Sequence, residues 1–137
     1  MASSDHDPVQ ILRGVHVLLV DDDKEAVELI GTILRYSGAL VLGVLSARAA
    51  LKALQTVKPD ILVADVSMPD EDGYWLLREV RALSPEQGGT VPVVAIADDT
   101  QDPGERRIRS AGFAAYLLKP IAPWELCRTL ASLVGPR

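Results

Sequence analysis

Short apolar runs alternate along this chain with longer stretches in which apolar residues recur at helical spacing. The runs are too short for buried helices, and the alternation is typical of a parallel α/β sheet rather than a helical bundle or a β-sandwich. The pattern occurs five times. The expected strands cover residues 15–20, 39–45, 61–64, 91–97 and 114–118. We therefore expect an α/β fold with five parallel strands and five helices.

A helix is expected after each strand. The five helical segments are residues 24–36, a segment capped by Ser46 that carries Leu51 and Leu54, a segment with Leu76, Leu77 and Val80, residues 101–111, and residues from about 123 to 134. Right-handed crossovers between parallel strands place such helices on both faces of a doubly wound sheet. The 137 residues leave room for one domain, which we place at residues 14–137 after an N-terminal tail of residues 1–13.

Composition excludes several classes of protein. With 14 basic and 19 acidic residues, the formal charge is −5, and the chain has only six aromatic residues. Direct binding to nucleic acid is therefore not expected. The single cysteine, Cys127, rules out an internal disulfide and a cysteine-cluster metal site. Neither a secretion signal nor an apolar run of about 20 residues is present, so we expect no membrane span and a cytoplasmic protein.

Charged residues directly follow four of the five expected strands. They are Asp21, Asp22 and Asp23 after the first strand, Asp65 after the third, Asp98 and Asp99 after the fourth, and Lys119 after the fifth. In a doubly wound sheet the ligand site lies beyond the carboxyl ends of the strands. If the first and third strands are neighbours, Asp21, Asp22 and Asp65 repel one another by about 1 to 4 kcal/mol per pair, depending on the dielectric. A hard divalent cation, Mg²⁺ or Mn²⁺, would relieve that repulsion.

Lys119 adds a positive charge suited to a phosphoryl oxygen. A metal and a lysine together could hold a phosphoryl group, and an aspartate between them could attack phosphorus and form an aspartyl phosphate. Asp65 is the candidate nucleophile, because it stands alone on its strand whereas Asp21 and Asp22 are paired. For Asp23 and Asp72 we expect the ordinary role of a helix cap.

Three motifs resemble the receiver domain of two-component response regulators. They are VLLVDDD at residues 17–23, PDILVADVSMPDEDG at residues 59–73 and YLLKP at residues 116–120. The resemblance implies a flavodoxin-like sheet with strand order 2-1-3-4-5. It also implies that Asp65 accepts a phosphoryl group from a phosphohistidine on a histidine kinase or histidine phosphotransfer protein. The lead-in at residues 12–14 is similar to that of receivers in hybrid histidine kinases.

The resemblance also assigns roles at the site. Mg²⁺ would be bound by Asp21, Asp22, Asp65 and the backbone carbonyl of Ser67, and Lys119 would contact the phosphoryl oxygens. The bond between Lys119 and Pro120 is often cis in this family. Tyr116 matches an aromatic switch position on the face formed by the fourth helix, fifth strand and fifth helix, where a downstream protein or a second copy of the chain would bind.

One position departs from the family pattern. Ala97 stands where the family usually has serine or threonine, and Asp98 follows where a small residue is usual. Because Ala97 cannot donate a hydrogen bond, we expect phosphoryl transfer to continue with a blunted conformational response. Asp98 could also modulate access of the phosphate.

Three alternatives remain open. The first is a pseudo-receiver that binds partners without phosphorylation, which Ala97 and Asp98 favour. The second is a phosphatase resembling haloacid dehalogenases, which would use Asp21 as its nucleophile. The third is a flavodoxin-like carrier of FMN, which the three consecutive aspartates at residues 21–23 disfavour because they would repel its phosphate.

Overall fold

Five parallel strands form one sheet in the order β2-β1-β3-β4-β5. The computed structural model describes residues 10–98 and 105–135. The strands are β1 (His16–Val20), β2 (Leu40–Val44), β3 (Ile61–Asp65), β4 (Val93–Asp98) and β5 (Ala115–Lys119). The predicted fold class and strand order are confirmed. Two bounds matter for function, because Asp65 and Lys119 are the last residues of their strands rather than the first residues of the loops that follow.

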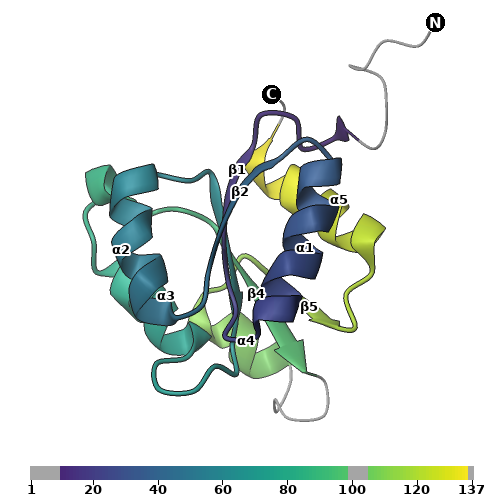
Figure 1. Cartoon of the computed structure of the whole chain (residues 1–137). Coiled ribbons are helices and arrows are strands. Elements are labelled where there is room, and N and C mark those ends of the chain that lie inside the picture. The colour runs from purple at the N-terminus through teal and green to yellow at the C-terminus, as the bar shows by residue number, and fades with distance from the viewer. Residues whose placement is uncertain (1–9, 99–104, 136–137) are drawn as a thin grey trace, which may run out of the picture.

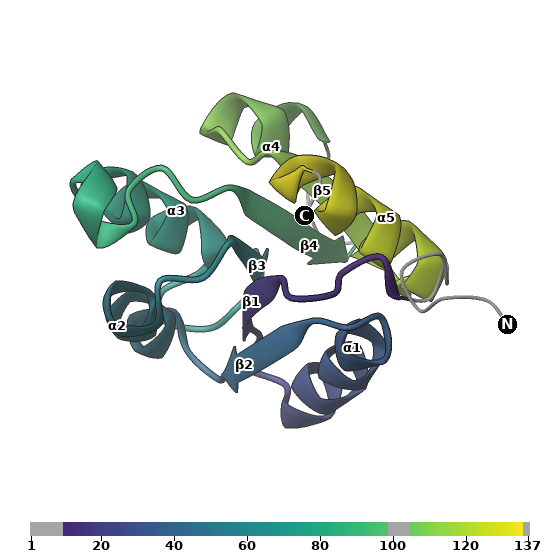
Figure 2. The same cartoon turned by 90° about the horizontal axis from the view of Figure 1, so that it is seen from above.

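Helices cover both faces of the sheet, as Figures 1 and 2 show. They are α1 (Lys24–Tyr36), α2 (Ala47–Val57), α3 (Gly73–Arg81), α4 (Glu105–Ala111) and α5 (Pro123–Val134), with a short 3₁₀ helix at Pro85–Gln87. The first part of the expected fourth helix, residues 101–104, lies outside the described residues. No helix within residues 10–98 and 105–135 is long and apolar enough to cross a membrane.

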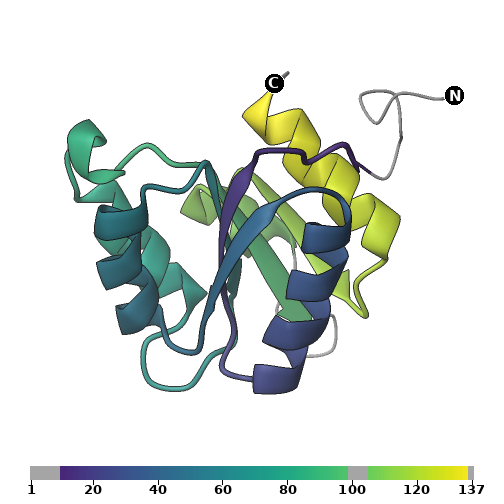
Figure 3. The same ribbon diagram turned by 45° about the horizontal axis from the view of Figure 1, so that its top comes forward.

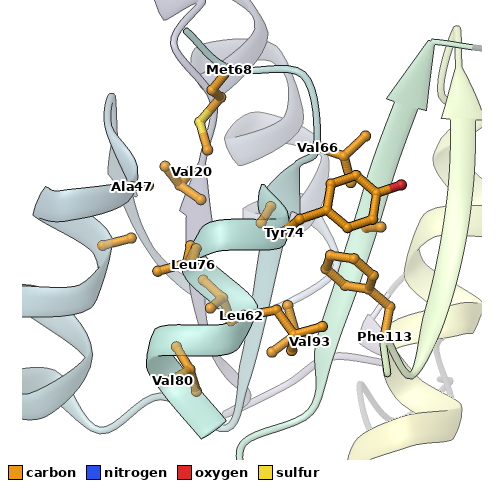
Figure 4. Close-up of a cluster of buried hydrophobic side chains, with 14 of the residues drawn as sticks. Val20, Ala47, Leu62, Val66, Met68, Tyr74, Leu76, Val80, Val93 and Phe113 are labelled. Carbon is orange, nitrogen blue, oxygen red and sulfur yellow. The ribbon is translucent and has the colours of Figure 1, made fainter. Parts of the chain in front are cut away.

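The core has two layers, one on each face of the sheet. Helices α1 and α5 pack on one face through Ile30, Leu34, Leu126 and Leu130. Helices α2, α3 and α4 pack on the other, and Figure 4 shows part of this layer, in which side chains of β1, β3 and β4 meet those of α2 and α3. The middle strand β3 is buried along its whole length, as expected for a strand covered on both faces.

Side-chain caps fix where three helices begin. The side chains of Asp23, Ser46 and Asp72 accept hydrogen bonds from backbone N–H groups in the first turns of α1, α2 and α3. Each cap satisfies a donor that has no partner within its helix. The predicted capping roles of Asp23 and Asp72 are therefore confirmed, and the capped helix starts lie on the same edge as the carboxyl ends of the strands (Figure 3).

The packed structure begins before residue 14. Leu12 is fully buried against the α1 and α5 layer, and its N–H donates to the carbonyl of Ser37 over 2.8 Å. Residues 10–13, which the sequence analysis assigned to the tail, thus belong to the folded part. Residues 1–9 lie outside the described residues.

Candidate functional site

Three aspartates converge at the carboxyl edge of the sheet. Asp21 directly follows β1, Asp22 comes next, and Asp65 ends β3. One carboxylate oxygen from each lies within 4.8 Å of the others. Asp21 and Asp65 are buried, with 0% and 4% of their surface exposed, whereas Asp22 is exposed. The neighbouring strands β1 and β3 therefore bring together the three residues that the sequence analysis selected, and their oxygens could hold a metal ion.

Lys119 reaches this group from the end of β5, on the far side of β4. Its Nζ lies 3.0 Å from Asp65 Oδ2 and 3.4 Å from Asp21 Oδ2. The side chain of Lys119 keeps 34% of its surface exposed, so the cation lies at the mouth of the site with the two carboxylates beneath it. The peptide bond between Lys119 and Pro120 is cis.

Each buried carboxylate is held by the backbone through its other oxygen. The N–H of Asp23 donates to Asp21 Oδ1 over 2.9 Å, and the N–H of Ser67 donates to Asp65 Oδ1 over 2.8 Å. One oxygen of each carboxylate is thus fixed by its own loop, and the other, Oδ2, faces Lys119. Asp65 Oδ2 is therefore the oxygen that is available to Lys119 or to a metal ion.

The electrostatics of the site favour a bound cation. The pKa of the Asp21 carboxyl rises from 3.8 to about 6, chiefly because burial removes the carboxylate from water. The hydrogen bond from the backbone N–H of Asp23 opposes this rise, as does the positively charged ammonium of Lys119. The negative charge of Asp65 adds to the rise. For Lys119, burial acts to lower the pKa, but hydrogen bonds and attraction from Asp65 and Asp21 outweigh burial and raise the pKa above 10.5. Lys119 therefore stays charged and offsets only part of the carboxylate charge.

Gly73, the last residue of the motif at residues 59–73, allows α3 to approach the site closely. A Cβ atom at this position would lie 2.7 Å from the carbonyl oxygen of Asp65 and 2.9 Å from the Cα of Val66. Because these neighbours are backbone atoms, they cannot move aside without displacing the end of β3. The first residue of α3 is thus in direct contact with the backbone that carries the Asp65 carboxylate. In the sequence, the position of Gly73 at the end of an acidic loop is the feature that could have indicated this close contact.

The residues at the end of β4 lie beside the site. Ala97 is fully buried and belongs to the α2 and α3 layer, whereas Asp98 is partly exposed and is the register partner of Lys119. The methyl group of Ala97 offers no hydrogen-bond donor. Tyr116 is half-buried on β5 and packs against the same layer. Asp99, the next residue of the predicted cluster, lies outside the described residues.

Three other titratable side chains, those of His16, Cys127 and Arg107, belong to other parts of the fold. His16 is exposed at the opposite end of β1, where its backbone N–H donates to the carboxylate of Asp60. Cys127 is buried in α5 with its Sγ 3.1 Å from Ser37 Oγ, and burial raises the pKa of its thiol. Arg107 is exposed on α4 but lies over the ring of Tyr74, 4.1 Å from its centre. Figure 4 shows Tyr74 beside Phe113, and their rings meet edge to face at 5.5 Å.

A comparison with known families decides the identity of this architecture. The family model for the response regulator receiver domain matches residues 17–131, which span the three aspartates and Lys119. The chain is a response regulator receiver domain. As such it is a signalling domain of two-component systems rather than a classical enzyme. This membership argues against the phosphatase and flavin-carrier alternatives.

Relatives of this receiver domain include both small proteins and parts of kinases. It is 36% identical over 120 residues to an uncharacterized protein of Leptolyngbya boryana, covering 88% of this chain and 90% of that protein. It is 36% identical over 124 residues to the sensor histidine kinase GacS of Pseudomonas protegens, covering 90% of this chain and 14% of the kinase. The receiver domain therefore spans only a small part of that larger relative.

A solved structure with a bound metal is also similar. The receiver domain of a Pseudomonas aeruginosa sensor histidine kinase, solved with a magnesium ion coordinated in its active-site cleft, is 32% identical. The superposition has a TM-score of 0.79 and covers 90% of this chain and 99% of that one.

Proposed function

We propose that Asp65 is the phosphoacceptor of this receiver domain and that it takes a phosphoryl group from a phosphohistidine on a histidine kinase or histidine phosphotransfer protein. The observation that carries the proposal is the position of Asp65 Oδ2. It lies at a strand end 3.0 Å from the ammonium of Lys119, and two further carboxylates lie within metal-sharing distance. With a cation held by these carboxylates, the nucleophile would lie between that ion and the ammonium of Lys119.

The donor set fits a hard divalent cation. Asp21, Asp22 and Asp65 supply carboxylate oxygens, the backbone carbonyl of Ser67 would add a fourth ligand, and Mg²⁺ or Mn²⁺ prefers such oxygen ligands. When bound, the ion would neutralise carboxylate charge and polarise phosphoryl oxygens. The raised pKa of Asp21 supports this proposal, because an ion-free site must bury a carboxylate beside another of the same sign.

In the transfer step, one carboxylate oxygen of Asp65 forms a bond to phosphorus while the bond from phosphorus to the histidine nitrogen breaks. The nitrogen keeps the electron pair, and the product is an aspartyl phosphate. Asp65 is oriented by the N–H of Ser67. Lys119 moves from Asp65 to the phosphoryl oxygens, and it arrives charged because its pKa lies above its ordinary value.

The response to phosphorylation should be weaker than in a receiver with a hydroxyl at the end of β4. A hydrogen bond to a charged group contributes about 1.5–3 kcal/mol. Without it at Ala97, phosphorylation should change the conformational equilibrium constant by a factor that is roughly tenfold to hundredfold smaller than in a receiver with the hydroxyl. Asp98 would set a carboxylate beside the phosphate and modulate access to it. We further propose that Tyr116 lies on the surface, formed by α4, β5 and α5, that contacts a downstream protein or a second copy of the chain in the cytoplasm.

The second candidate function is a pseudo-receiver that binds its partners without phosphorylation. The buried methyl group of Ala97 and the acidic side chain of Asp98 favour it. The two candidates share a fold and a surface, and they differ in whether Asp65 reacts.

Intact mass after incubation with acetyl phosphate separates the two candidates. Wild-type protein with Mg²⁺ should gain one phosphoryl group, and the same protein in EDTA should gain none. Asp65→Asn should not react, whereas the matched control Asp70→Asn, which removes an exposed acidic group from the same loop, should react like the wild type. If no adduct forms in any sample, the pseudo-receiver is correct. An adduct that persists in Asp65→Asn would place the phosphoryl group elsewhere.

A further inference from the structure

An arginine on α2 holds the loop between β3 and α3, outside the carboxylate site. Arg48 Nε donates to Glu71 Oε1 over 3.0 Å, and its Nη2 donates to Glu71 Oε2 over 3.3 Å. The same guanidinium lies 5.2 Å from the centre of the Trp75 ring. Arg48 therefore bonds both oxygens of a loop carboxylate while it covers an aromatic ring at the start of α3. This forked geometry defines direction as well as distance.

The loop that Arg48 holds is the one that leads away from Asp65. Its first part is anchored in the core by Val66 and Met68, which are 3% and 5% exposed. Its second part contains Asp70, whose φ of 61° is left-handed, a conformation that aspartate adopts more readily than most residues with a side chain. The ion pair between Arg48 and Glu71 joins this second part to α2. The start of α2 and this loop lie along the same lower edge of the molecule in Figure 3.

A short path joins Glu71 to the proposed metal ligands. Two residues after Glu71, Gly73 lies against the carbonyl of Asp65 so tightly that a Cβ would be 2.7 Å away. On the other side, the N–H of Ser67 fixes Asp65 Oδ1 over 2.8 Å. A displacement of the loop at Glu71 would therefore be passed to the backbone of Asp65 and to Ser67, whose carbonyl is a proposed ligand.

We propose that Arg48 is a positioning residue that holds the β3–α3 loop through Glu71 and Trp75 and thereby keeps Asp65 and Ser67 arranged for a divalent cation. The inference rests on the proposed function, because it concerns the same metal site. Arg48 itself makes no hydrogen bond or ion pair with Asp21, Asp22 or Asp65.

Long-range electrostatics and the positioning role predict opposite effects of Arg48→Gln on Mg²⁺ affinity, so this substitution distinguishes the two. If only long-range electrostatics mattered, Arg48→Gln would strengthen Mg²⁺ binding by removing a positive charge, and Glu71→Gln would weaken it. If the pair positions the loop, both substitutions weaken binding, by about twofold to fivefold, the range expected for an exposed ion pair. The double variant should then bind no more weakly than the single variants, because the pair acts as a unit.

The experiment measures Mg²⁺ dissociation constants by calorimetry for wild type, Arg48→Gln, Glu71→Gln and the double variant. Lys52→Gln is the matched control, since Lys52 lies on the same helix and lines the same groove beside Trp75. Urea unfolding in EDTA should show that all variants remain folded with similar stability. The rate of phosphorylation by acetyl phosphate should fall at low Mg²⁺ and recover at saturating Mg²⁺.

Tighter binding by Arg48→Gln, or binding changed equally by Lys52→Gln, would overturn the positioning role, as would additive effects in the double variant. Wild-type protein that fails to bind Mg²⁺ would overturn the metal site of the proposed function as well. The two failures are distinguishable, because in the first the wild type still binds the ion.

Discussion

Replacing Asp21 by asparagine should make the metal-free protein more stable while it damages the metal site. The carboxylate is fully buried, and its pKa of about 6 compares with an ordinary value of 3.8. At about 1.36 kcal/mol per pKa unit, burying the charged form destabilises the native state by about 3 kcal/mol above the higher pKa. Asparagine can still accept the N–H of Asp23, but its amide would face Lys119. We therefore expect a net gain in stability that is positive but smaller than about 3 kcal/mol.

The stability of the wild type depends on pH through the Asp21 carboxyl. Since the native carboxyl binds a proton more tightly than the unfolded one, the wild type loses stability as the pH rises from about 4 to about 6, through the interval between its two pKa values. The advantage of Asp21→Asn should therefore be largest above about pH 7 and should vanish near pH 4. Urea unfolding in EDTA at a series of pH values measures it.

Asp70→Asn is the control for net charge, because it removes an exposed acidic group from the loop after β3. Added Mg²⁺ should stabilise the wild type more than Asp21→Asn, because a ligand that binds only the native state stabilises it by mass action. Two results would contradict the conclusion that the buried, charged Asp21 carboxylate destabilises the metal-free protein. One is that Asp21→Asn is less stable than the wild type in EDTA above pH 7, and the other is that its gain in stability does not depend on pH.

Three further predictions concern single side chains of the site. Ala97→Thr should raise the ratio of switched to unswitched conformer in the phosphorylated protein roughly tenfold or more, as measured by NMR of the phosphorylated and free protein; an unchanged ratio would contradict the role given to the missing hydroxyl. Lys119→Met should not weaken Mg²⁺ binding, because it removes a positive charge beside the ligands, but it should slow the formation of the phosphoryl adduct; a normal rate would remove Lys119 from the transfer step. Gly73→Ala should lower the free energy of unfolding by about 1–3 kcal/mol in a denaturant titration, because its Cβ would lie 2.7 Å from the Asp65 carbonyl; wild-type stability would show that α3 can move away at little cost.

Local patterns in the sequence were enough to predict the architecture. Helical spacing gave α1 its observed limits, Lys24–Tyr36, and the short apolar runs gave the five strands within one or two residues. Strand order depended on the family resemblance, because periodicity does not say which strands pair. The gathering of Asp21, Asp22 and Asp65 followed from a general rule about parallel sheets, that their carboxyl ends share one edge.

Contacts between distant segments could not be predicted in this way. Arg48 and Glu71 are 23 residues apart and lie in different elements, so no local pattern pairs them. Leu12 follows Ile11 in a short segment outside the predicted strands and helices, and only tertiary packing shows that it belongs to the core. The close approach of Gly73 to Asp65 likewise depends on how α3 meets β3.

Chemical trapping of the phosphorylated protein shows which aspartate carries the phosphoryl group. Protein incubated with acetyl phosphate and Mg²⁺ is treated with borohydride, which reduces an aspartyl phosphate to homoserine, and peptides are then sequenced by mass spectrometry. If Asp65 is the phosphoacceptor, homoserine appears at position 65, and Asp21 and Asp22 remain unmodified aspartates. Homoserine at either of those two positions, or an intact aspartate at position 65 in protein that has gained a phosphoryl group, would contradict this assignment.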